Sequence, residues 1–366
     1  MVRAGDPLFT DRRRPELTYV APASGKVVEI RLGGRRSLDV LAIELDGAAG
    51  RAFDVPAALS RETLTALLVA SGQWQGLRTR PFDDTPAPGS APDALFVTAI
   101  DTRPFAPDPA AVIERHSGFF RKGLEALRLL SGGMTHLCHA AGTVPPQVEG
   151  VTPSAFSGPH PAGLAGTHIH LLHPVGPDRT VWHIGYQDVI AIGHLLETGT
   201  IWTRRVVSLA GNGVAAPSLV ETAPGCDLAE LCAGRTVDAP VRLVAGPRLD
   251  GRSEAWLARG HLQATVFAQP RRRAAIPSDL ASRLRGWLSM GGDAIIPNAV
   301  HERAAPAGIL AIPFLRAISV GDIETARKLG ALELAEEDMA LLTHVDGGGT
   351  DFGRLLRRTL DELRQA

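Results

Sequence analysis

The sequence predicts a chain of several domains that combines an α/β fold with all-β domains and ends in a helical segment. Its 366 residues exceed the length at which a single hydrophobic core stops growing. Between residues 94 and 139 a strand, a helix and a strand follow one another, an order typical of a parallel sheet. From Ser319 onward, apolar residues recur at helical spacing.

Residues 1–55 predict a small β domain. Short strand patterns at 18–20, 26–30 and 40–45 are accompanied by a turn pattern at 21–25 that contains Pro and Gly. This arrangement resembles the barrel-sandwich hybrid of biotinyl and lipoyl carrier domains. Because the carrier lysine is absent from the hairpin tip, we expect the domain to act as a scaffold.

The segment 56–92 is expected to be a helical connection and linker. Arg61 to Ser71 has a helical pattern, and 86–92 is rich in Pro and small residues. Repeated Pro and Gly deny both helix and sheet hydrogen bonds, so we place a domain boundary after 86–92.

Residues 93–203 predict an α/β domain. The apolar run 94–100 is bounded by turn residues, as expected for a strand buried on both faces. Asp108, followed by Pro109, predicts the start of a helix. One apolar stripe then precedes a strand at 134–139, and the stripe consists of Phe120, Leu124, Leu127 and Leu130.

Residues 204–268 predict a second β domain. A hairpin is expected over 205–222, turning at Asn212-Gly213, because Asn-Gly tolerates the positive φ angles of tight turns. A short helix at 227–232 and a strand at 241–245 complete a pattern typical of a small β-grasp unit.

Residues 269–366 predict a mostly helical C-terminal domain. Helices are expected over 322–329, where Gly330 ends the pattern, and over 336–342. A last helix carries Leu356, Leu360 and Leu363 on one face.

Composition and motifs exclude several classes of function. The net charge of −1 offers no basic field for nucleic acid. No apolar run approaches the roughly 20 residues that span a bilayer, and the three cysteines have no ligand spacing. The loop 101–107 lacks the glycine through which a dinucleotide pyrophosphate approaches the backbone, so a nucleotide site of the usual kind is not expected.

The histidine-rich segment 157–174 is the richest candidate site. If His168 and His170 lie on a strand, they share a face and form a metal site with His160 or His173. The segment also fits a structured loop or interface, and neutral imidazoles suit a quinone or a proton. Because no carboxylate lies within the segment, we assign no metal ligand and no catalytic residue.

A second candidate site is 119–122, where aromatic rings adjoin cations. The alternative is a helix with one buried Phe and a solvated basic face. Residues 182–192, which include Tyr186, Gln187 and Asp188, are interpreted as a strand leading into a helix rather than as a pocket.

Six stretches in order carry a resemblance to one family. They are Ala21-Pro22-Ala23-Ser24-Gly25, Leu77-Arg78-Thr79-Arg80-Pro81-Phe82, Phe96-Val97-Thr98-Ala99-Ile100-Asp101-Thr102, Gly158-Pro159-His160-Pro161-Ala162-Gly163 with Gly166-Thr167-His168-Ile169-His170, Tyr186-Gln187-Asp188-Val189-Ile190-Ala191-Ile192-Gly193, and Leu332-Glu333-Leu334 with Glu336-Glu337-Asp338. Together they resemble the NqrA family, subunits of the sodium-translocating NADH:quinone reductases, over nearly the whole chain.

The resemblance implies a Rossmann-like α/β domain, a β-grasp (SLBB-like) domain and a helical C-terminal part. It also implies a cytoplasmic subunit, attached peripherally to the inner membrane through partner subunits, that is not catalytic alone. No tightly bound cofactor is expected. Flavin and NADH sites belong to partner subunits, and ubiquinone is the expected substrate ligand.

The resemblance has three departures. The chain begins inside the family's first domain, so we expect that Met1 is not the ancestral start and that an upstream segment pairs with the edges of 27–30 or 40–45. The region 267–297 looks contracted, and Leu342 and Asp346 replace cysteines frequent in the family.

If the chain binds a quinone headgroup, we expect the site to lie between the helix 119–122 and the loop 158–170. The candidate residues are Phe119, Phe120, Lys122, His160 and His168, which offer flat apolar contact and hydrogen-bond donors. A docking face for a membrane subunit is the alternative for these residues. A His-rich metalloenzyme and a stand-alone scaffold that has lost the complex are the alternatives for the whole chain.

Overall fold

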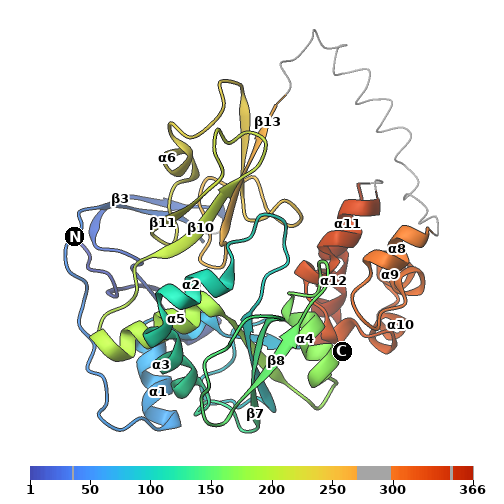
Figure 1. Cartoon of the computed structure of the whole chain (residues 1–366), viewed down its shortest axis with the longest axis horizontal. Coiled ribbons are helices and arrows are strands. Elements are labelled where there is room, and N and C mark those ends of the chain that lie inside the picture. The colour runs from blue at the N-terminus through green and yellow to red at the C-terminus, as the bar shows by residue number, and fades with distance from the viewer. Residues whose placement is uncertain (35–36, 270–297, 347–348, 366) are drawn as a thin grey trace.

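The computed structural model describes residues 1–366 except 35–36, 270–297, 347–348 and 366 (Figure 1). Its N-terminal part consists of two antiparallel hairpins: β1 (Pro7–Asp11) with β2 (Arg14–Val20), and β3 (Gly25–Leu32) with β4 (Leu38–Leu45). The three predicted strands and the turn before β3 are confirmed. Among the described residues β3 pairs with β4 and, through Gly25, forms a bridge with Val2, while Val28 and Ile30 remain more than half exposed.

A five-stranded sheet forms the centre of the molecule. Its order is β5 (Arg78–Arg80), β9 (Val181–Gly185), β6 (Ala94–Ala99), β7 (Met134–Ala140) and β8 (Val151–Phe156). Strands β6 to β9 are parallel, as predicted, and β5 runs antiparallel at the edge. β5 and the helix α1 (Arg61–Ala70) come from the segment 56–92, and both Leu64 and Leu68 of α1 pack into the core of this sheet.

Helices cover the two faces of this sheet. One face is covered by α2 (Pro109–Arg115), α3 (Ser117–Leu127) and α5 (Tyr186–Thr198), and the other by α4 (Ala165–Leu172). The predicted helix cap is confirmed, because the Asp108 side chain accepts a hydrogen bond from the Ala110 N–H. All four residues of the predicted apolar stripe are fully buried.

The strand assumed for His168 and His170 is wrong, because both residues lie on the helix α4. The alternation of His and apolar residues there imitates a strand. Ala165 and Ile169, four residues apart, nevertheless form a helical stripe that packs against Phe96 of the sheet.

The third part has a four-stranded sheet with the short helix α6 (Leu228–Cys232). The strand order is β11 (Ser218–Thr222), β10 (Arg205–Ala210), β13 (Gln263–Ala268) and β12 (Val241–Ala245). The predicted hairpin, short helix and strand are confirmed, but the turn differs. The positive φ angle, 115°, lies at Gly211, while the side chain of Asn212 accepts a hydrogen bond from the Ala268 N–H at 3.0 Å.

The C-terminal part is helical, as predicted. Its helices are α8 (Ala299–Ala304), α9 (Ala311–Val320), α10 (Ile323–Lys328), α11 (Ala340–Asp346) and α12 (Phe352–Gln365), with 3₁₀ turns at Ala331–Glu333 and Glu336–Met339. Leu356 and Leu360 of α12 are fully buried, and Leu363 packs against the same core. Most of the region that looked contracted, 267–297, lies outside the described residues. No helix in the described part of the chain is long and apolar enough to span a membrane.

Candidate functional site

The sheet opens a crevice at the point where its strand order reverses. From β6 the chain proceeds to β7 and β8 on one side, and β9 then returns to the other side of β6. Open α/β sheets bind ligands at the carboxyl ends of the two strands that flank such a reversal. A cleft of about 230 Å³ lies there, and its lining includes Thr98, Asp101, Arg103, His183, Tyr186, Arg205, Arg259 and Glu337.

An ion network fills one side of this crevice. Arg103, in the loop after β6, contacts Asp101 at 3.3 Å and forms an ion pair with Glu337 of the C-terminal part. Burial alone would raise the pKa of Glu337, but Arg103 and Arg80 outweigh burial and lower it. Carboxylates therefore stand where a dinucleotide would place its pyrophosphate.

A second cluster adjoins the first and surrounds Arg80, whose side chain is fully buried. Arg80 pairs with Asp83, contacts Glu337 at 3.2 Å and lies 3.7 Å from Asp338. The ring of His183 contacts both Arg80, at 2.8 Å, and Asp83, at 3.3 Å. Burial raises the pKa of Asp338 to about 7, so this acid retains a proton that an exposed aspartate would release.

A third network links the α/β domain to the second β domain. Asp188, in the first turn of α5, pairs with Arg205 and contacts Arg259 at 3.2 Å. The neighbouring Gln187 exchanges two hydrogen bonds with the backbone of Val206, at 2.8 and 2.9 Å. The interpretation of 182–192 as a strand and a helix was right, but it missed that Tyr186 to Asp188 line the crevice and hold the next domain.

The predicted histidines do not converge on a metal. His160 lies 3.3 Å from the hydroxyl of Thr102, whereas His168 is fully buried and contacts the carbonyl of Ala162 at 3.0 Å. His170 is turned elsewhere and pairs with Glu333 at 2.6 Å. Residues two apart on a helix point to different sides, which is the reason for this divergence. The described residues contain no group of three or more potential metal ligands.

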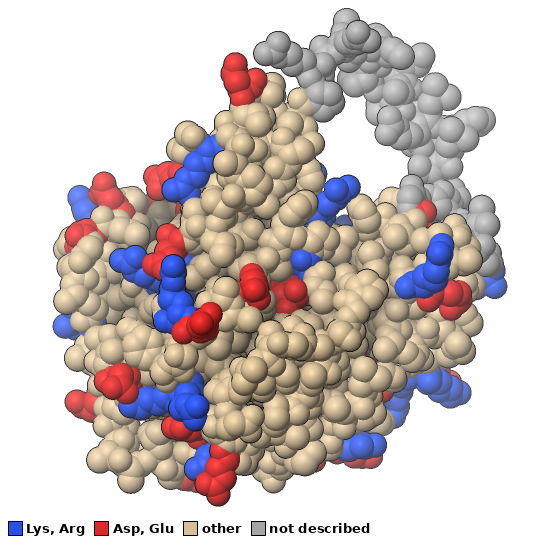
Figure 2. All heavy atoms as spheres, viewed as in Figure 1, with Lys and Arg blue, Asp and Glu red and all other residues tan. Residues whose placement is uncertain are grey.

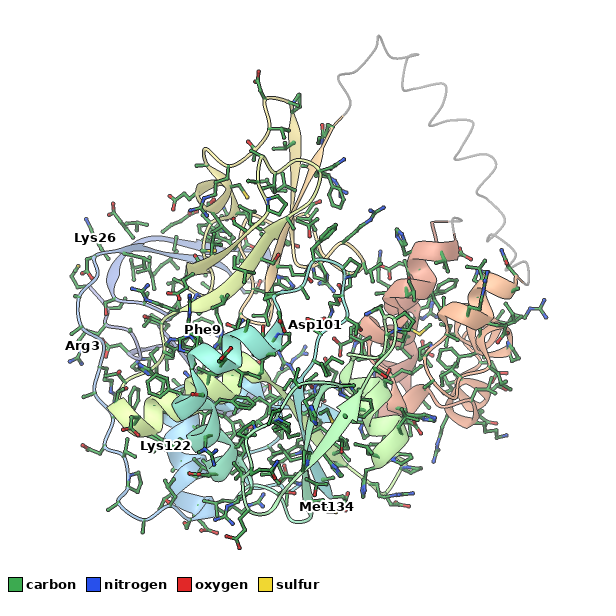
Figure 3. The ribbon with its side chains drawn as sticks, in the orientation of Figure 1. Arg3, Phe9, Lys26, Asp101, Lys122 and Met134 are labelled. Atoms are coloured by element: carbon green, nitrogen blue, oxygen red, sulfur yellow. The ribbon has the colours of Figure 1, made fainter. Side chains whose placement is uncertain are left out.

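The helix 119–122 and the loop 158–170 do not flank one pocket, contrary to expectation. Phe120 is buried in the core between α3, α5 and the sheet, whereas His168 belongs to the helix on the other face. Lys122 pairs with Glu197 of α5, and Phe119 contacts His194 edge-on at 5.1 Å. Figure 3 shows Lys122 on the outer side of α3, well away from Asp101 at the crevice.

Comparison with known proteins adds sequence evidence to this geometry. Three family models match: the NqrA N-terminal barrel-sandwich hybrid domain over residues 1–46, the NqrA second alpha/beta domain over 59–201, and the NQRA C-terminal domain over 206–254. The NqrA subunit of the Na(+)-translocating NADH-quinone reductase of Pseudomonas aeruginosa is 42% identical over 395 residues, spanning 100% of this chain and 88% of its own length. The chain belongs to this family. The corresponding subunit of Yersinia pestis bv. Antiqua is 40% identical over 404 residues with the same coverage.

Similarity to solved structures is weak. An NAD⁺-reducing NiFe hydrogenase in its air-oxidized state superposes with a TM-score of 0.47 and 14% identity, covering 83% of this chain and 64% of the other.

Most of the stretches that resembled the family meet at the crevice and its flanks. Gly166 faces Asp338 so closely that a Cβ there would lie 2.4 Å from a carboxylate oxygen. The N–H of Gly163 donates to the hydroxyl of Thr102 at 2.9 Å, and a Cβ at Gly163 would lie 2.6 Å from the Thr102 nitrogen. The family motifs are thus separated in sequence but form one junction in space.

Sequence reasoning missed Arg80, Arg103, Arg205, Arg259 and Glu337 as site residues. The available signal was positional: Asp101 to Arg103 and Tyr186 to Asp188 each follow a predicted strand, and parallel strands end at the same edge of a sheet. The arginines of the later domain had no such signal, because only tertiary contact brings them to the crevice.

Proposed function

We propose that this chain is a peripheral subunit of a Na(+)-translocating NADH-quinone reductase and supports electron transfer from NADH to quinone coupled to sodium export. The observation that carries the proposal is family membership along the whole chain. The chain attaches to the cytoplasmic side of the inner membrane through the other subunits, which hold the flavins and the NADH site.

The crevice supports the part of this proposal that concerns NADH: the chain alone does not oxidise it. Arg103 and Glu337 occupy it, and Asp101 would repel a pyrophosphate. The loop after β6 also offers no glycine amide to a phosphate, which makes the site a poor phosphate cradle.

We propose a finer description of the domains as well. The α/β domain, 93–203, is Rossmann-like, supported by its parallel order and the crevice at the reversal. The domain 204–268 is β-grasp-like, supported by its four-stranded sheet and α6. The segments 1–55, 56–92 and 269–366 make up the rest, with α1 and β5 of 56–92 packed onto the α/β domain.

Quinone, in this proposal, meets the chain on the His160 side of the crevice. His160 is partly exposed, and burial lowers its pKa to about 4, so a neutral imidazole is available to a quinone carbonyl. Phe120 and His168 are fully buried and act through packing. Phe119 and Lys122 lie across the sheet from this point.

Assays on membranes and on the purified chain test the proposal. The chain, expressed in a strain that lacks its own NqrA, should restore NADH-dependent quinone reduction in membranes, whereas the purified chain should not consume NADH. A short-tail quinone should bind the purified chain, and His160→Ala should weaken that binding at least several-fold while the control Phe119→Ala leaves it unchanged. Robust NADH oxidation by the chain alone, or failure to restore activity, would contradict the proposed function.

A further inference from the structure

One long stretch of the chain is almost free of charge. Between Leu129 and Pro177 the only Asp, Glu, Lys or Arg is Glu149. At the average of 21% charged residues, roughly one residue in five of such a stretch would be charged. A buried core would explain the deficit, but much of this stretch is not buried.

The middle of the stretch lies on the surface. Residues 141–160 comprise the loop after β7, the edge strand β8 and the loop toward α4, and every one of them is at least partly exposed. Val144 is 95% exposed. Figure 2 shows a broad face without charged side chains over the part of the molecule where Figure 1 places β7, β8 and α4. We name residues 141–146 and 151–157 the uncharged face; it is bordered by Glu149, by Arg121, which donates to the carbonyl of Gln147, and by Arg128 beside Gly150.

Strand addition does not suit this face. The Phe156 carbonyl accepts a hydrogen bond from Ala141 at the end of β7, so by alternation Thr152 and Ser154 also direct their backbone groups toward β7. Pro153 therefore lies at an outward position of the edge, where it has no N–H to donate. A partner must pack against the side chains instead.

The absence of charged side chains on this face favours a protein over lipid or nucleic acid as its partner. An anionic lipid surface attracts Lys and Arg, and nucleic acid does the same, but the uncharged face offers neither. The cores of protein interfaces are depleted of charged residues, because each unpaired charge is costly to bury. A neutral face of this kind complements a protein surface that is itself uncharged.

We propose that the uncharged face is the surface through which the chain docks on another subunit of the reductase, one that presents an uncharged contact surface. This inference rests on the proposed function. It adds the location of the contact: the β8 side of the α/β domain, away from the crevice and from the second β domain.

Charge insertion tests the docking surface. Val144→Glu and Ala155→Glu, singly and together, should reduce the amount of chain recovered with affinity-tagged partner subunits from membranes, by at least tenfold for the pair. Val320→Glu and Leu219→Glu make the matched change at exposed apolar positions elsewhere, 80% and 52% exposed, and should leave recovery unchanged. Circular dichroism and thermal unfolding of each purified variant check that the fold is retained.

Each possible result supports or overturns the proposed docking on another subunit. Recovery of the folded face variants at the parent level, beside a recovered parent, overturns this inference alone. Failure of the parent to co-purify overturns the proposed function and this inference with it. A change of oligomeric state in sedimentation without loss from the complex means that the face joins two copies. Binding of the purified parent to anionic lipid vesicles that is abolished in Val144→Glu means that the face meets lipid. Either result overturns the docking of another subunit.

Discussion

At the scale of single residues, the junction at the crevice holds more acids than bases. Two arginines, Arg80 and Arg103, face four carboxyl groups: Asp83, Asp101, Glu337 and Asp338. In a buried cluster this imbalance is relieved when one acid keeps its proton. Asp338 is that acid, since burial raises its pKa to about 7, whereas the pKa of Glu337 is lowered by the arginines.

Replacing Asp338 by Asn should alter how stability depends on pH. The folded chain holds the Asp338 proton up to about pH 7, but the unfolded chain loses it near 3.8, so the stability from this group falls as pH rises through that window. Relative to the parent, Asp338→Asn should gain about 1–3 kcal/mol in free energy of unfolding between pH 5 and pH 8. Urea unfolding at several pH values measures this difference.

Stability is compared between variant and parent because the buried histidines change the free energy of unfolding with pH in the direction opposite to Asp338. Burial lowers the pKa of His160, His168 and His183, so their contribution is lost as pH falls below their ordinary value of 6.5. Both proteins share that loss, and it largely cancels in the difference. The exposed Asp178→Asn is the control, and a pH-independent difference for Asp338→Asn would contradict a retained proton.

At the scale of elements, the α/β domain depends on the close approach of α3 and α5. A Cβ at Gly193 of α5 would lie 1.8 Å from the carbonyl oxygen of Phe119, and one at Gly123 of α3 would lie 2.2 Å from that of Val189. Neither glycine has a positive φ angle. They are required by helix packing and not by backbone conformation.

Gly193→Ala should therefore destabilise the chain, although alanine is normally the better helix residue. The added methyl group must push the helices apart, at a cost of about 1–3 kcal/mol. Gly118→Ala is the matched control, because Gly118 also lies on a helix and a Cβ there meets nothing within 4 Å. The control should gain about 0.4–1 kcal/mol. Equal effects of the two substitutions in urea unfolding would refute the packing argument.

At the scale of the whole molecule, ion networks at the domain junctions hold the parts in place. Asp188 joins Arg205 at the start of the second β domain with Arg259 near its end. Arg259 also donates to the carbonyl of Gly72 at 2.6 Å and to Gln73 at 2.9 Å, which connects this domain to the segment before β5.

Asp188→Ala should loosen the second β domain from the α/β domain. The substitution leaves Arg205, which is 4% exposed, without its carboxylate, and breaking a buried pair in this way costs about 3–5 kcal/mol. Calorimetry should show a separate, earlier transition. Glu221→Ala is the control, since its partners Arg115 and Arg204 are 70% and 67% exposed and such pairs contribute about 0–1 kcal/mol. A single transition at the parent temperature for Asp188→Ala would rule out this role.

Local patterns predicted most of the elements because they depend on nearby residues. The cap at Asp108, the buried run of β6 and the stripe of α3 follow from side-chain chemistry within a few positions. A pattern too short to distinguish the alternation of a strand from the spacing of a helix led to a wrong expectation. His168 to His170 alternates like a strand for three residues, and only packing of Ile169 beneath the sheet makes it a helix.

Runs of consecutive residues were enough to establish the family, the order of the domains and the absence of a glycine loop after β6. The residues of the candidate site, in contrast, could be identified from the folded chain alone. Arg80, Arg103, His183 and Glu337 are separated by up to 257 positions in the chain, yet Arg80 meets His183 of β9, and both Arg80 and Arg103 meet Glu337. No local pattern encodes such a meeting, because it depends on the strand order of the sheet and on how the C-terminal part packs against it.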